Sequence, residues 1–508
     1  MNLFGHVADP QAIAIRDERS AVTWEVLDEQ LSRFANRLQQ EPLGDARRIA
    51  VFAENAVETG MANLGGLLGG ASVVPVNFHL TAEEAAYILE DSGAAVLFVG
   101  PATVERGVAA AKLAGVPTVV GWSGDAGKPL QGALDWSAWI AEGAADCPDL
   151  ERCPLPNLLY TSGTTGRPKG TELPPTMFAG GGSIKEHMAA LRESPLAPLG
   201  PHLIVGPMYH TGPLSGARLL VAGTQSVVLG KFNPEATLAA IDKYKTASTV
   251  MVPTHFVRLL ALPDEVKAKY DCSSMIRASH TGAKCPVEVK KAMIDWWGPV
   301  FTDAYGASEV GTTCMITSEE WLENPGSVGR SVPPFTAMVL DDDDNVVPAG
   351  TEGRLFFKDA TGRGVVYHND PEKSAAAHIA PGVFTLGEIG YMNEEGFVFI
   401  TDRFSDMVVS GGVNLYPAEA EQVLIEHDDV LDVACIGVPH AEMGEELKAL
   451  VIAKSDNHVS EAELINWCRD RLSTYKCPRS LEFVADLGRN TMGKINKRKL
   501  RAPYWADK

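Results

Sequence analysis

The sequence has few basic residues and no long apolar run, and both absences exclude classes of function. Lys and Arg number 44 against 65 Asp and Glu, which gives a formal net charge of −21 at pH 7. Such a chain repels nucleic-acid phosphates and anionic membrane surfaces, so we expect neither as a partner. The most apolar stretch, residues 61–76, is shorter than the ~20 residues of a membrane span. We therefore expect no transmembrane segment, and a buried helix followed by a strand at that place.

The eight cysteines are scattered and match no metal or disulfide pattern. None of them occurs in a CxxC pair, and no His lies nearby at the spacing of a zinc site. The N-terminus, MNLFGHVADPQAIAIRDE, lacks the basic region and apolar core of a secretory signal. We expect reduced thiols and a cytoplasmic protein.

Apolar periodicity in the first part of the chain predicts an α/β fold. A chain of 508 residues is large enough for at least two domains. Residues 23–39 have apolar side chains at helical spacing, and short apolar strands then alternate with helices, with strands expected at 48–53, 73–76 and 95–99 and helices at 61–68 and 82–89. This alternation continues to residue 252. Helices interleaved with short strands indicate parallel sheets covered by helices.

After residue 337 the pattern changes to hairpins. AMVLDDDDNVVPAGTEGRLFFK and GYMNEEGFVFI each place a polar turn between two apolar runs, which predicts a small β-rich, antiparallel subdomain. The aspartates at 341–344 lack the spacing and the closing Glu of an EF-hand, so we expect a solvated turn there rather than a calcium site.

The end of the chain has the content of a small separate domain. A glycine turn at 411–412 is followed by a helix at 418–427, strands at 433–438 and 447–453, and a helix at 461–472. We place the boundary near Ser405. The expected organisation is a large N-terminal domain of helix-covered sheets with its β-rich subdomain (1–404), and a small mobile α+β C-terminal domain (405–508).

The segment TSGTTGRPKG, residues 161–170, has the composition of an anion-binding loop. Its glycines let successive amides converge on an anion, its hydroxyl side chains add donors, and Lys169 supplies a positive charge. A Walker A loop is disfavoured, because GxxxxGK[ST] counted from Gly163 has Pro168 in place of Gly and Gly170 in place of Ser or Thr. A plain surface turn would explain the glycines and hydroxyls but not their order.

Further motifs follow this loop along the chain. They are PMYHTGP (207–213), HTGAKCP (280–286), DAYGASE (303–309), PGSVGR (325–330), GEIGYMNEEGFVFITDR (387–403), SGGVNLYPAEAE (410–421) and NTMGKINKRKL (490–500). Over nearly the whole chain, and in the same order, they resemble the motifs of the adenylate-forming superfamily of acyl-CoA synthetases, luciferases and peptide-synthetase adenylation domains. The resemblance is greatest to bacterial CoA ligases for fatty or bulky acids.

This resemblance implies a two-step reaction that uses ATP, Mg²⁺ and coenzyme A. A carboxylate would attack the α-phosphate of MgATP to give an acyl-adenylate and pyrophosphate, and the CoA thiolate would then displace AMP. Two anions must meet in the first step. The site therefore needs cations and amides directed at the charge that develops on the α-phosphate.

Matching the motifs residue by residue implies a nucleotide site. The β- and γ-phosphates would be bound by Thr161, Ser162, Gly163, Thr164, Thr165, Gly166 and Lys169. The adenosine part would be bound by Gly282, Ala283, Lys284, Asp303, Ala304, Gly306 and a stacked Tyr305, with Glu388 and Arg403 at the ribose. Ser308 would contact the α-phosphate, and Glu309 would hold Mg²⁺ as a hard oxygen donor.

Lys494 matches the family's lysine that bridges the carboxylate and the α-phosphate, and we expect it to be the main catalytic residue. Without the motif order it would read as a solvated lysine in a basic tail. Two positions depart from the family pattern: Glu388 replaces the usual Asp, and Ser405 stands at the hinge where Lys or Asp is common. These departures leave open a catalytically inactive nucleotide-binding homologue.

The sequence constrains the acid less than the nucleotide. Gly306 stands where acetate-activating relatives have a pocket-filling Trp, so a medium-chain, long-chain, aromatic or sterol-type acid should fit. Tyr209, His210 and Gly212 would line the acyl pocket, and His210 would also take part in the thiolation step unless it is only a hydrogen-bonded core residue.

The expected acyl acceptor is CoA. Ser410, Gly411 and Gly412 match the turn that lines the pantetheine tunnel of CoA ligases. The alternatives are an enzyme that loads a separate carrier protein and a P-loop ATPase, which would release phosphate. A homodimer remains open.

Overall fold

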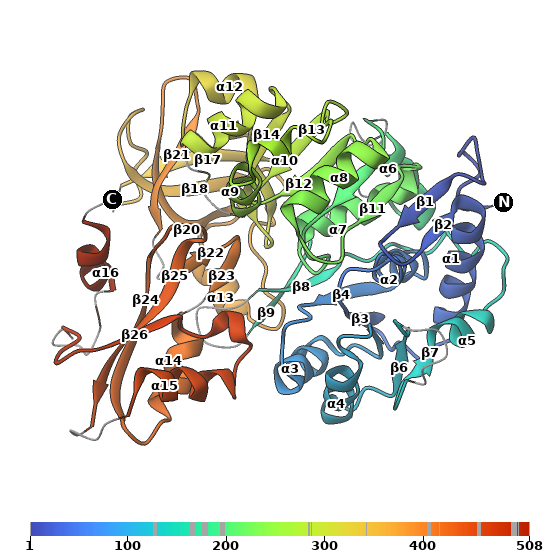
Figure 1. The fold of residues 1–508 in the computed structure, drawn as a ribbon, viewed down its shortest axis with the longest axis horizontal. Coiled ribbons are helices and arrows are strands. Elements are labelled where there is room, and N and C mark those ends of the chain that lie inside the picture. The colour runs from blue at the N-terminus through green and yellow to red at the C-terminus, as the bar shows by residue number, and fades with distance from the viewer. Residues whose placement is uncertain are drawn as a thin grey trace.

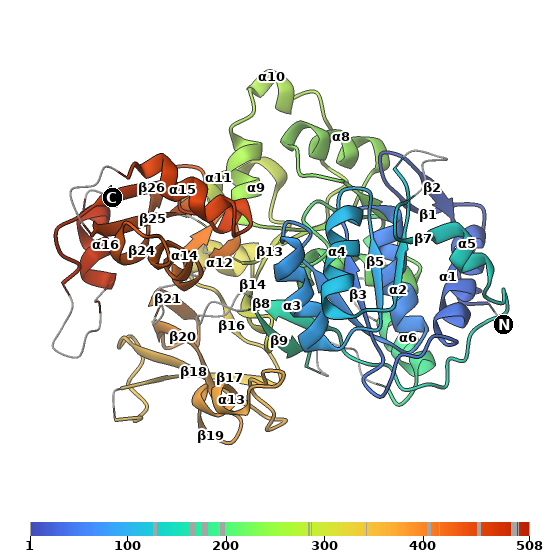
Figure 2. The same ribbon diagram turned by 90° about the horizontal axis from the view of Figure 1, so that it is seen from below.

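The structure is a computed structural model, and it describes residues 2–124, 130–161, 168–174, 181–193, 199–282, 285, 287–341, 343–403, 408–415, 417–454, 459–488, 495 and 497–506. The fold is mixed α/β, with a large N-terminal domain and a small C-terminal domain (Figure 1). In Figure 2 the C-terminal domain and the β-rich sheet that precedes it in the chain lie on the same side of the N-terminal elements.

The first helix-covered sheet is parallel and buried on both faces. Its strands are β3 (Arg48–Phe52), β4 (Ser72–Val76), β5 (Val96–Val99), β6 (Thr118–Gly121) and β7 (Leu134–Asp135), in the order β4-β3-β5-β6-β7. Its helices are α1 (Trp24–Leu38), α2 (Val57–Leu68), α3 (Ala82–Ser92), α4 (Val104–Ala114) and α5 (Trp136–Ala141). In β3, Ile49 and Val51 pack with α1, α2 and α5, whereas Ala50 and Phe52 pack with α3 and α4. Burial of both faces explains why β3, β4 and β5 are nearly continuous apolar runs, whereas the edge strand β7 is exposed.

A second, nine-stranded sheet lies against the first. Its order is β16-β15-β14-β13-β12-β10-β11-β1-β2. The strands are β1 (Ile13–Arg16), β2 (Ala21–Thr23), β10 (His202–Ile204), β11 (Ser226–Val228), β12 (Ser248–Met251), β13 (Arg277–His280), β14 (Phe301–Ala307), β15 (Gly311–Thr317) and β16 (Arg330–Ser331). From β1 to β14 the neighbours are parallel, and the strands at both edges are antiparallel.

Helices cover both faces of the nine-stranded sheet. They are α6 (Ile184–Arg192), α7 (Thr211–Arg218), α8 (Pro234–Tyr244), α9 (Pro253–Leu260), α10 (Asp264–Lys267), α11 (Val287–Trp297) and α12 (Ser318–Glu323), with a 3-10 helix at Leu219–Ala222. One core contains side chains of α8, α9 and α11. On the other face, α6 and α7 share a core with α1 and α2. The two sheets are thus joined by a common layer of helices.

The expected β-rich region and C-terminal domain follow. The first contains β17 (Phe335–Leu340), β18 (Gly353–Asp359), β19 (His378–Ala380), β20 (Val383–Met392), β21 (Val398–Arg403) and α13 (Pro371–Ala376). The second contains β22 (Val408–Ser410), β23 (Val413–Leu415), β24 (Val430–His440), β25 (Gly444–Ala453), β26 (Ser480–Phe483), α14 (Pro417–Ile425), α15 (Glu461–Arg469), α16 (Lys497–Trp505) and a 3-10 helix at Thr474–Lys476. A separate hairpin, β8 (Leu158–Thr161) and β9 (Lys169–Glu172), carries the glycine-rich loop.

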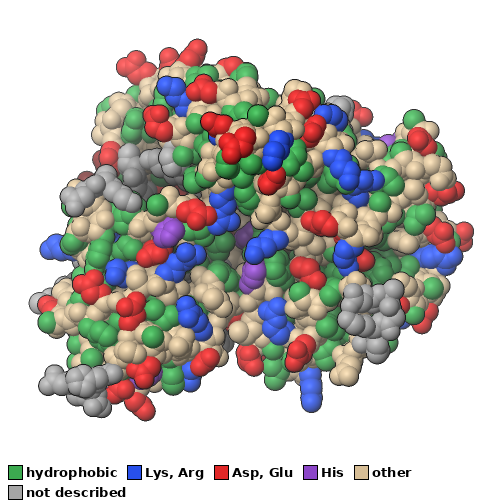
Figure 3. Space-filling model, in the orientation of Figure 1, with side chains coloured by type: hydrophobic (Ala, Val, Ile, Leu, Met, Phe, Trp, Pro, Cys, Tyr) green, Lys and Arg blue, Asp and Glu red, His purple; other side chains and the backbone are tan. Residues whose placement is uncertain are grey.

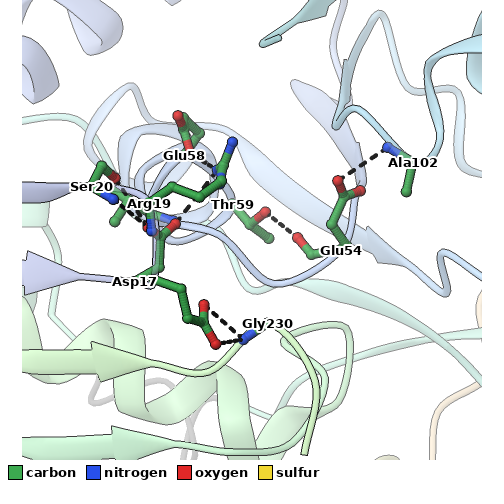
Figure 4. A network of polar contacts seen from close by, with 10 residues as sticks. Asp17, Arg19, Ser20, Glu54, Glu58, Thr59, Ala102 and Gly230 are labelled. Atoms are coloured by element: carbon green, nitrogen blue, oxygen red, sulfur yellow. Dashed lines mark hydrogen bonds and ion pairs between the residues drawn. The ribbon is translucent and has the colours of Figure 1, made fainter. Parts of the chain in front are cut away.

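Polar contacts tie the β1–β2 turn to both sheets (Figure 4). The Asp17 carboxylate accepts a hydrogen bond of 3.0 Å from the Val57 amide at the start of α2. The Glu18 carboxylate accepts one of 3.0 Å from the Gly230 amide, which follows β11. Arg19, on the same turn, forms ion pairs with Asp17 and with Glu58 of α2. The turn therefore fixes the position of one sheet relative to the other.

The sequence predicted most of these elements. Residues 61–76 form the end of α2 and the buried strand β4, and Thr81 with Glu84 forms a capping box at the start of α3. The hairpins after residue 337 are β17–β18 and β20–β21. Among the residues that the structure describes, no helix is long and apolar enough to cross a membrane.

Candidate functional site

The predicted nucleotide motifs meet at the carboxyl edge of the nine-stranded sheet. The register of β12, β13 and β14 places Met251 beside His280 and His280 beside Asp303. Gly282 follows β13, and residues 303–309 lie on β14 and in the turn after it. This is the edge at which open α/β sheets bind ligands. The face seen in Figure 3 is hollowed near its centre, where His and Lys or Arg side chains lie on the walls.

Glu309 lies at the turn of the β14–β15 hairpin, near one ammonium and two hydroxyl groups. The Tyr367 hydroxyl donates a hydrogen bond to Glu309 Oε1 at 3.5 Å, and Lys373 Nζ lies 4.1 Å from the Tyr367 ring centroid. Burial raises the pKa of Glu309, and the Lys373 ammonium and the hydroxyls of Tyr367 and Thr161 oppose that rise. A carboxylate in this setting fits a hard divalent cation such as Mg²⁺.

Lys169, at the end of the glycine-rich loop, is paired with Asp370. Their side chains form an ion pair. In the β8–β9 hairpin Thr161 lies opposite Lys169, so the two ends of the loop are held together. Asp370 also caps α13, because it accepts a hydrogen bond of 3.0 Å from the Lys373 amide. The hydrogen bond from Lys169 lowers the pKa of Asp370. The positive charge of Lys169 is therefore balanced by a carboxylate from the β-rich region.

Tyr305 and Glu388, expected at the adenine and the ribose, are in direct contact. The Tyr305 hydroxyl donates a hydrogen bond of 2.8 Å to Glu388 Oε2. Glu388 is buried, and the β20–β21 register places it opposite Arg403. The longer Glu side chain at this position thus reaches the tyrosine that the family motif places beside the base.

A buried charged cluster supports Asp303 from below the edge. Lys290 Nζ lies 3.5 Å from Asp303 Oδ2, and His280 Nδ1 lies 3.6 Å from Asp303 Oδ1. Both His280 and Lys290 are fully buried. Burial lowers the pKa of His280 to about 4 and also lowers that of Lys290. Asp303 is therefore flanked by His280, the first residue of the HTGAKCP motif, and by Lys290, which lies outside the motifs.

Tyr209 and His210 lie together at the expected acyl pocket. Their ring centroids are 4.3 Å apart, and Tyr209 packs edge-on against Phe78, which follows β4. His210 precedes α7 and keeps solvent-accessible surface. Desolvation, and secondarily His79, lower the pKa of His210, which favours the neutral ring. A Cβ at Gly212 would lie 2.9 Å from Val250 Cγ1, so a glycine lets α7 approach β12 closely.

Gly306 has a backbone role in addition to the predicted one. A Cβ on this residue would lie 1.9 Å from the carbonyl oxygen of Gly311 on β15. The hairpin therefore needs a glycine here whatever the size of the acyl group. Gly306 therefore supports a large acid less strongly than the sequence indicated.

The predicted CoA turn lies against the nucleotide edge. Gly411 and Gly412 have φ angles of 57° and 80°, which favour glycine. A Cβ on Gly412 would lie 3.0 Å from Val252, and the Gly412 carbonyl oxygen lies 3.7 Å from the Cβ position of Gly282. Ser410, on β22, is buried. This turn of the C-terminal domain and the loop after β13 are thus in contact.

Several predicted residues lie outside the described part of the chain. They are Ser162, Gly163, Thr164, Thr165, Gly166, Ala283, Lys284, Ser405 and Lys494, and the same holds for the side chain of Arg403. Ala304 lies on β14 and Ser308 in the turn before Glu309. Tyr367, Asp370 and Lys373 were not predicted. Asp370 and Lys373 lie in NDPEK, which has the pattern of a simple helix cap, and Tyr367 belongs to no motif.

Two family matches cover most of the chain. Residues 6–365 match the AMP-binding enzyme family, and residues 419–494 match the AMP-binding enzyme C-terminal domain. The chain belongs to the AMP-binding enzyme family. It is therefore a member of the adenylate-forming superfamily that its motifs resemble.

Three curated relatives act on different acids or acceptors. The chain is 30% identical to the 3-[(3aS,4S,7aS)-7a-methyl-1,5-dioxo-octahydro-1H-inden-4-yl]propanoyl:CoA ligase of Rhodococcus jostii (strain RHA1), covering 96% of this chain and 95% of that one. It is 30% identical to a feruloyl-CoA synthase of Amycolatopsis sp, covering 97% and 96%. It is 29% identical to the fatty acid–[acyl-carrier-protein] ligase ScoC of Streptomyces coeruleorubidus, covering 98% and 95%.

Solved structures share the fold. The amide bond synthetase McbA from Marinactinospora thermotolerans matches with a TM-score of 0.84 at 25% identity, covering 99% of this chain and 100% of that one. The o-succinylbenzoate CoA synthetase MenE from Bacillus subtilis matches at 24% identity over 97% and 96% of the two chains. The TM-score is 0.80 for a MenE double mutant bound with its product analogue OSB-NCoA and 0.63 for MenE with the acyl-adenylate intermediate OSB-AMP.

Proposed function

We propose that this protein is an AMP-forming carboxylic acid:CoA ligase. The observation that carries the proposal is the grouping of Lys169, Glu309 and the Tyr305–Glu388 pair at one sheet edge, with the Gly411–Gly412 turn against the same edge. Phosphate-binding, metal-binding and base-stacking residue types are close together there, which a protein with only a structural role would not require.

The charges at this edge suit attack on the α-phosphate. Lys169 and Lys373 would attract the polyphosphate and offset the repulsion between it and the carboxylate. Glu309 would hold Mg²⁺, which supplies Lewis-acid charge neutralisation of the phosphates. Tyr305, held by Glu388, would orient the base. Lys494 would bridge the carboxylate and the α-phosphate, and rotation of residues 405–508 about Ser405 would bring it to the site.

The contact of the Gly411–Gly412 turn with the nucleotide edge supports a thiol acceptor. The two MenE structures have the same sequence identity to this chain, so we attribute their different TM-scores to different arrangements of the two domains. The greater match is to the complex with the product analogue OSB-NCoA. The contact between Gly412 and Val252 belongs to this arrangement and supports a tunnel for the pantetheine arm of CoA. The carrier-protein ligase ScoC keeps loading of a carrier protein as the second candidate.

We propose a class of acid substrate and not one compound. The relatives' bicyclic, hydroxycinnamic and fatty acids support a bulky or long apolar carboxylate. Phe78, Tyr209 and His210 provide the aromatic surface that such an acid requires.

A screen of fatty, aryl and sterol-type acids for AMP formation tests the proposal. We expect pyrophosphate and AMP to form with at least one acid when free CoA is present. Lys494→Ala should abolish acid-dependent pyrophosphate exchange but leave thioester formation from supplied acyl-adenylate largely intact. Lys454→Ala, an exposed lysine of the same domain, is the control. Phosphate release instead of pyrophosphate, or equal loss of both steps in Lys494→Ala, would contradict the proposal.

A further inference from the structure

The 3-10 helix Thr474–Lys476 of the C-terminal domain docks onto the N-terminal domain between β4 and α3. The Tyr475 hydroxyl accepts a hydrogen bond of 2.7 Å from Asn77 Nδ2, and Ser473 Oγ donates one of 2.6 Å to Glu84 Oε2. Figure 2 shows the segment after α15 beside the start of α3. Residues far apart in the sequence thus form one polar contact between the domains.

Lys476 lies between two carboxylates at this contact. Its Nζ is 3.0 Å from Glu84 Oε1 and 2.9 Å from Glu419 Oε2. The side chains of Lys476, Glu84 and Glu419 are 6%, 14% and 3% exposed, so the three charges are largely shielded from water. Burial opposes the charge on Lys476, but Glu419 and Glu84 outweigh it and raise the pKa of the ammonium. Burial raises the pKa of Glu419.

The two carboxylates that contact Lys476 belong to different domains, so domain rotation affects their ion pairs differently. Glu419 begins α14 of the same domain as Lys476, so this pair persists wherever the domain turns. Glu84 belongs to α3 of the N-terminal domain, so it meets Lys476 only in this orientation. The Lys476–Glu84 pair is therefore specific to one arrangement of the two domains.

The docked segment also reaches the candidate acyl channel. The ring centroids of His79 and Tyr475 are 6.1 Å apart. Burial, and secondarily Tyr475, raise the pKa of Tyr209. Tyr209 is the residue next to His210 in the expected channel wall. The docking of Thr474–Lys476 and the contact of Gly412 with Val252 are thus made in the same arrangement.

We propose that Glu84 and Lys476 are positioning residues for thioester formation, because their buried ion pair holds the C-terminal domain where the Gly411–Gly412 turn faces the nucleotide edge. This proposal rests on the ligase function proposed above. Adenylation needs Lys494 at the site instead, so a weaker ion pair favours the adenylation arrangement at the expense of the thioester-forming one.

Glu84→Gln in the full chain tests the ion pair. A Gln at this position also completes a capping box, so α3 keeps its start while the charge is lost. We expect thioester formation from supplied feruloyl-adenylate, or from the adenylate of whichever screened acid reacts, to slow about tenfold, as for the loss of a hydrogen bond to a charged group. Acid-dependent pyrophosphate exchange should be unchanged or faster. Equal slowing of both steps would overturn the proposal.

A second interdomain pair provides the matched control. Arg258 Nε and Glu442 Oε1 are 2.5 Å apart, but these side chains are 38% and 48% exposed. Glu442→Gln should therefore change thioester formation less than about twofold. An effect as large as that of Glu84→Gln would show that any interdomain charge matters equally, and would also overturn the proposal.

Hydrogen exchange separates failure of this proposal from failure of the ligase function. Backbone amides of residues 474–476 and 77–84 should exchange faster in Glu84→Gln, while those of β3 and β5 stay protected. This readout requires no substrate. Unchanged exchange at 474–476 in an active enzyme would refute the positioning role, whereas a wild-type protein without pyrophosphate exchange for any acid would refute the ligase function.

Discussion

Asp370→Asn should strengthen nucleotide binding by releasing Lys169. In the structure Lys169, Lys373, Glu309 and Asp370 form a cluster with balanced charge, and the substitution leaves it one unit positive. The Lys169 and Asp370 side chains are 18% and 27% exposed, so their pair is screened by solvent and contributes about 1 kcal/mol at most. Since ATP must replace Asp370 on Lys169, we expect the KM for ATP and the inhibition constant of pyrophosphate to fall about twofold to fivefold.

The choice of Asn keeps the other role of Asp370. Asn is as good an N-cap as Asp, so the start of α13 and the hydrogen bond to the Lys373 amide should remain. Asp370→Ala loses the cap as well, and its free energy of unfolding should fall by about 1 kcal/mol in urea denaturation. The KM for ATP of both variants is measured by initial-rate kinetics with the acid that reacts in the screen. If both substitutions raise the KM for ATP, Asp370 contributes to nucleotide binding directly and does not compete with ATP for Lys169.

Three further predictions test single residues of the N-terminal domain. Burial lowers the pKa of His202 from 6.5 to about 4, so the native state resists protonation of this ring. The free energy of unfolding should therefore fall by up to about 3 kcal/mol as the pH falls from 6.5 to 4. In urea titrations His202→Gln should flatten this pH profile, and an unchanged slope would contradict the prediction. Gly306→Ala should lower both stability and ATP binding, because its Cβ would meet the Gly311 carbonyl, and normal KM and Tm values would show that the hairpin can open. Lys290→Met should leave Asp303 without its buried ammonium and lower the free energy of unfolding, measured by urea denaturation, by about 3 kcal/mol. A change within about 0.5 kcal/mol, which is typical of surface substitutions, would mean that the pair does not stabilise the fold.

The secondary structure was predictable because local rules and burial agree. In residues 48–76 the two strands β3 and β4 are largely apolar and buried, and the helix between them, α2, ends at Gly69. The hairpins after residue 337 follow from polar turns between apolar runs. The motif order also identified the family, since fixed residue types at fixed places do not depend on knowing the fold.

The contacts between segments could not be predicted from the sequence. NDPEK reads as a helix cap, yet the fold places Asp370 on Lys169, two hundred residues earlier in the chain. Glu84 reads as part of a capping box, yet the same carboxylate holds Lys476 of the other domain. Local patterns determined which elements form and which family the chain belongs to. Only the tertiary structure decided which charges meet, because an ion pair depends on where two distant segments pack and on how much water that packing removes.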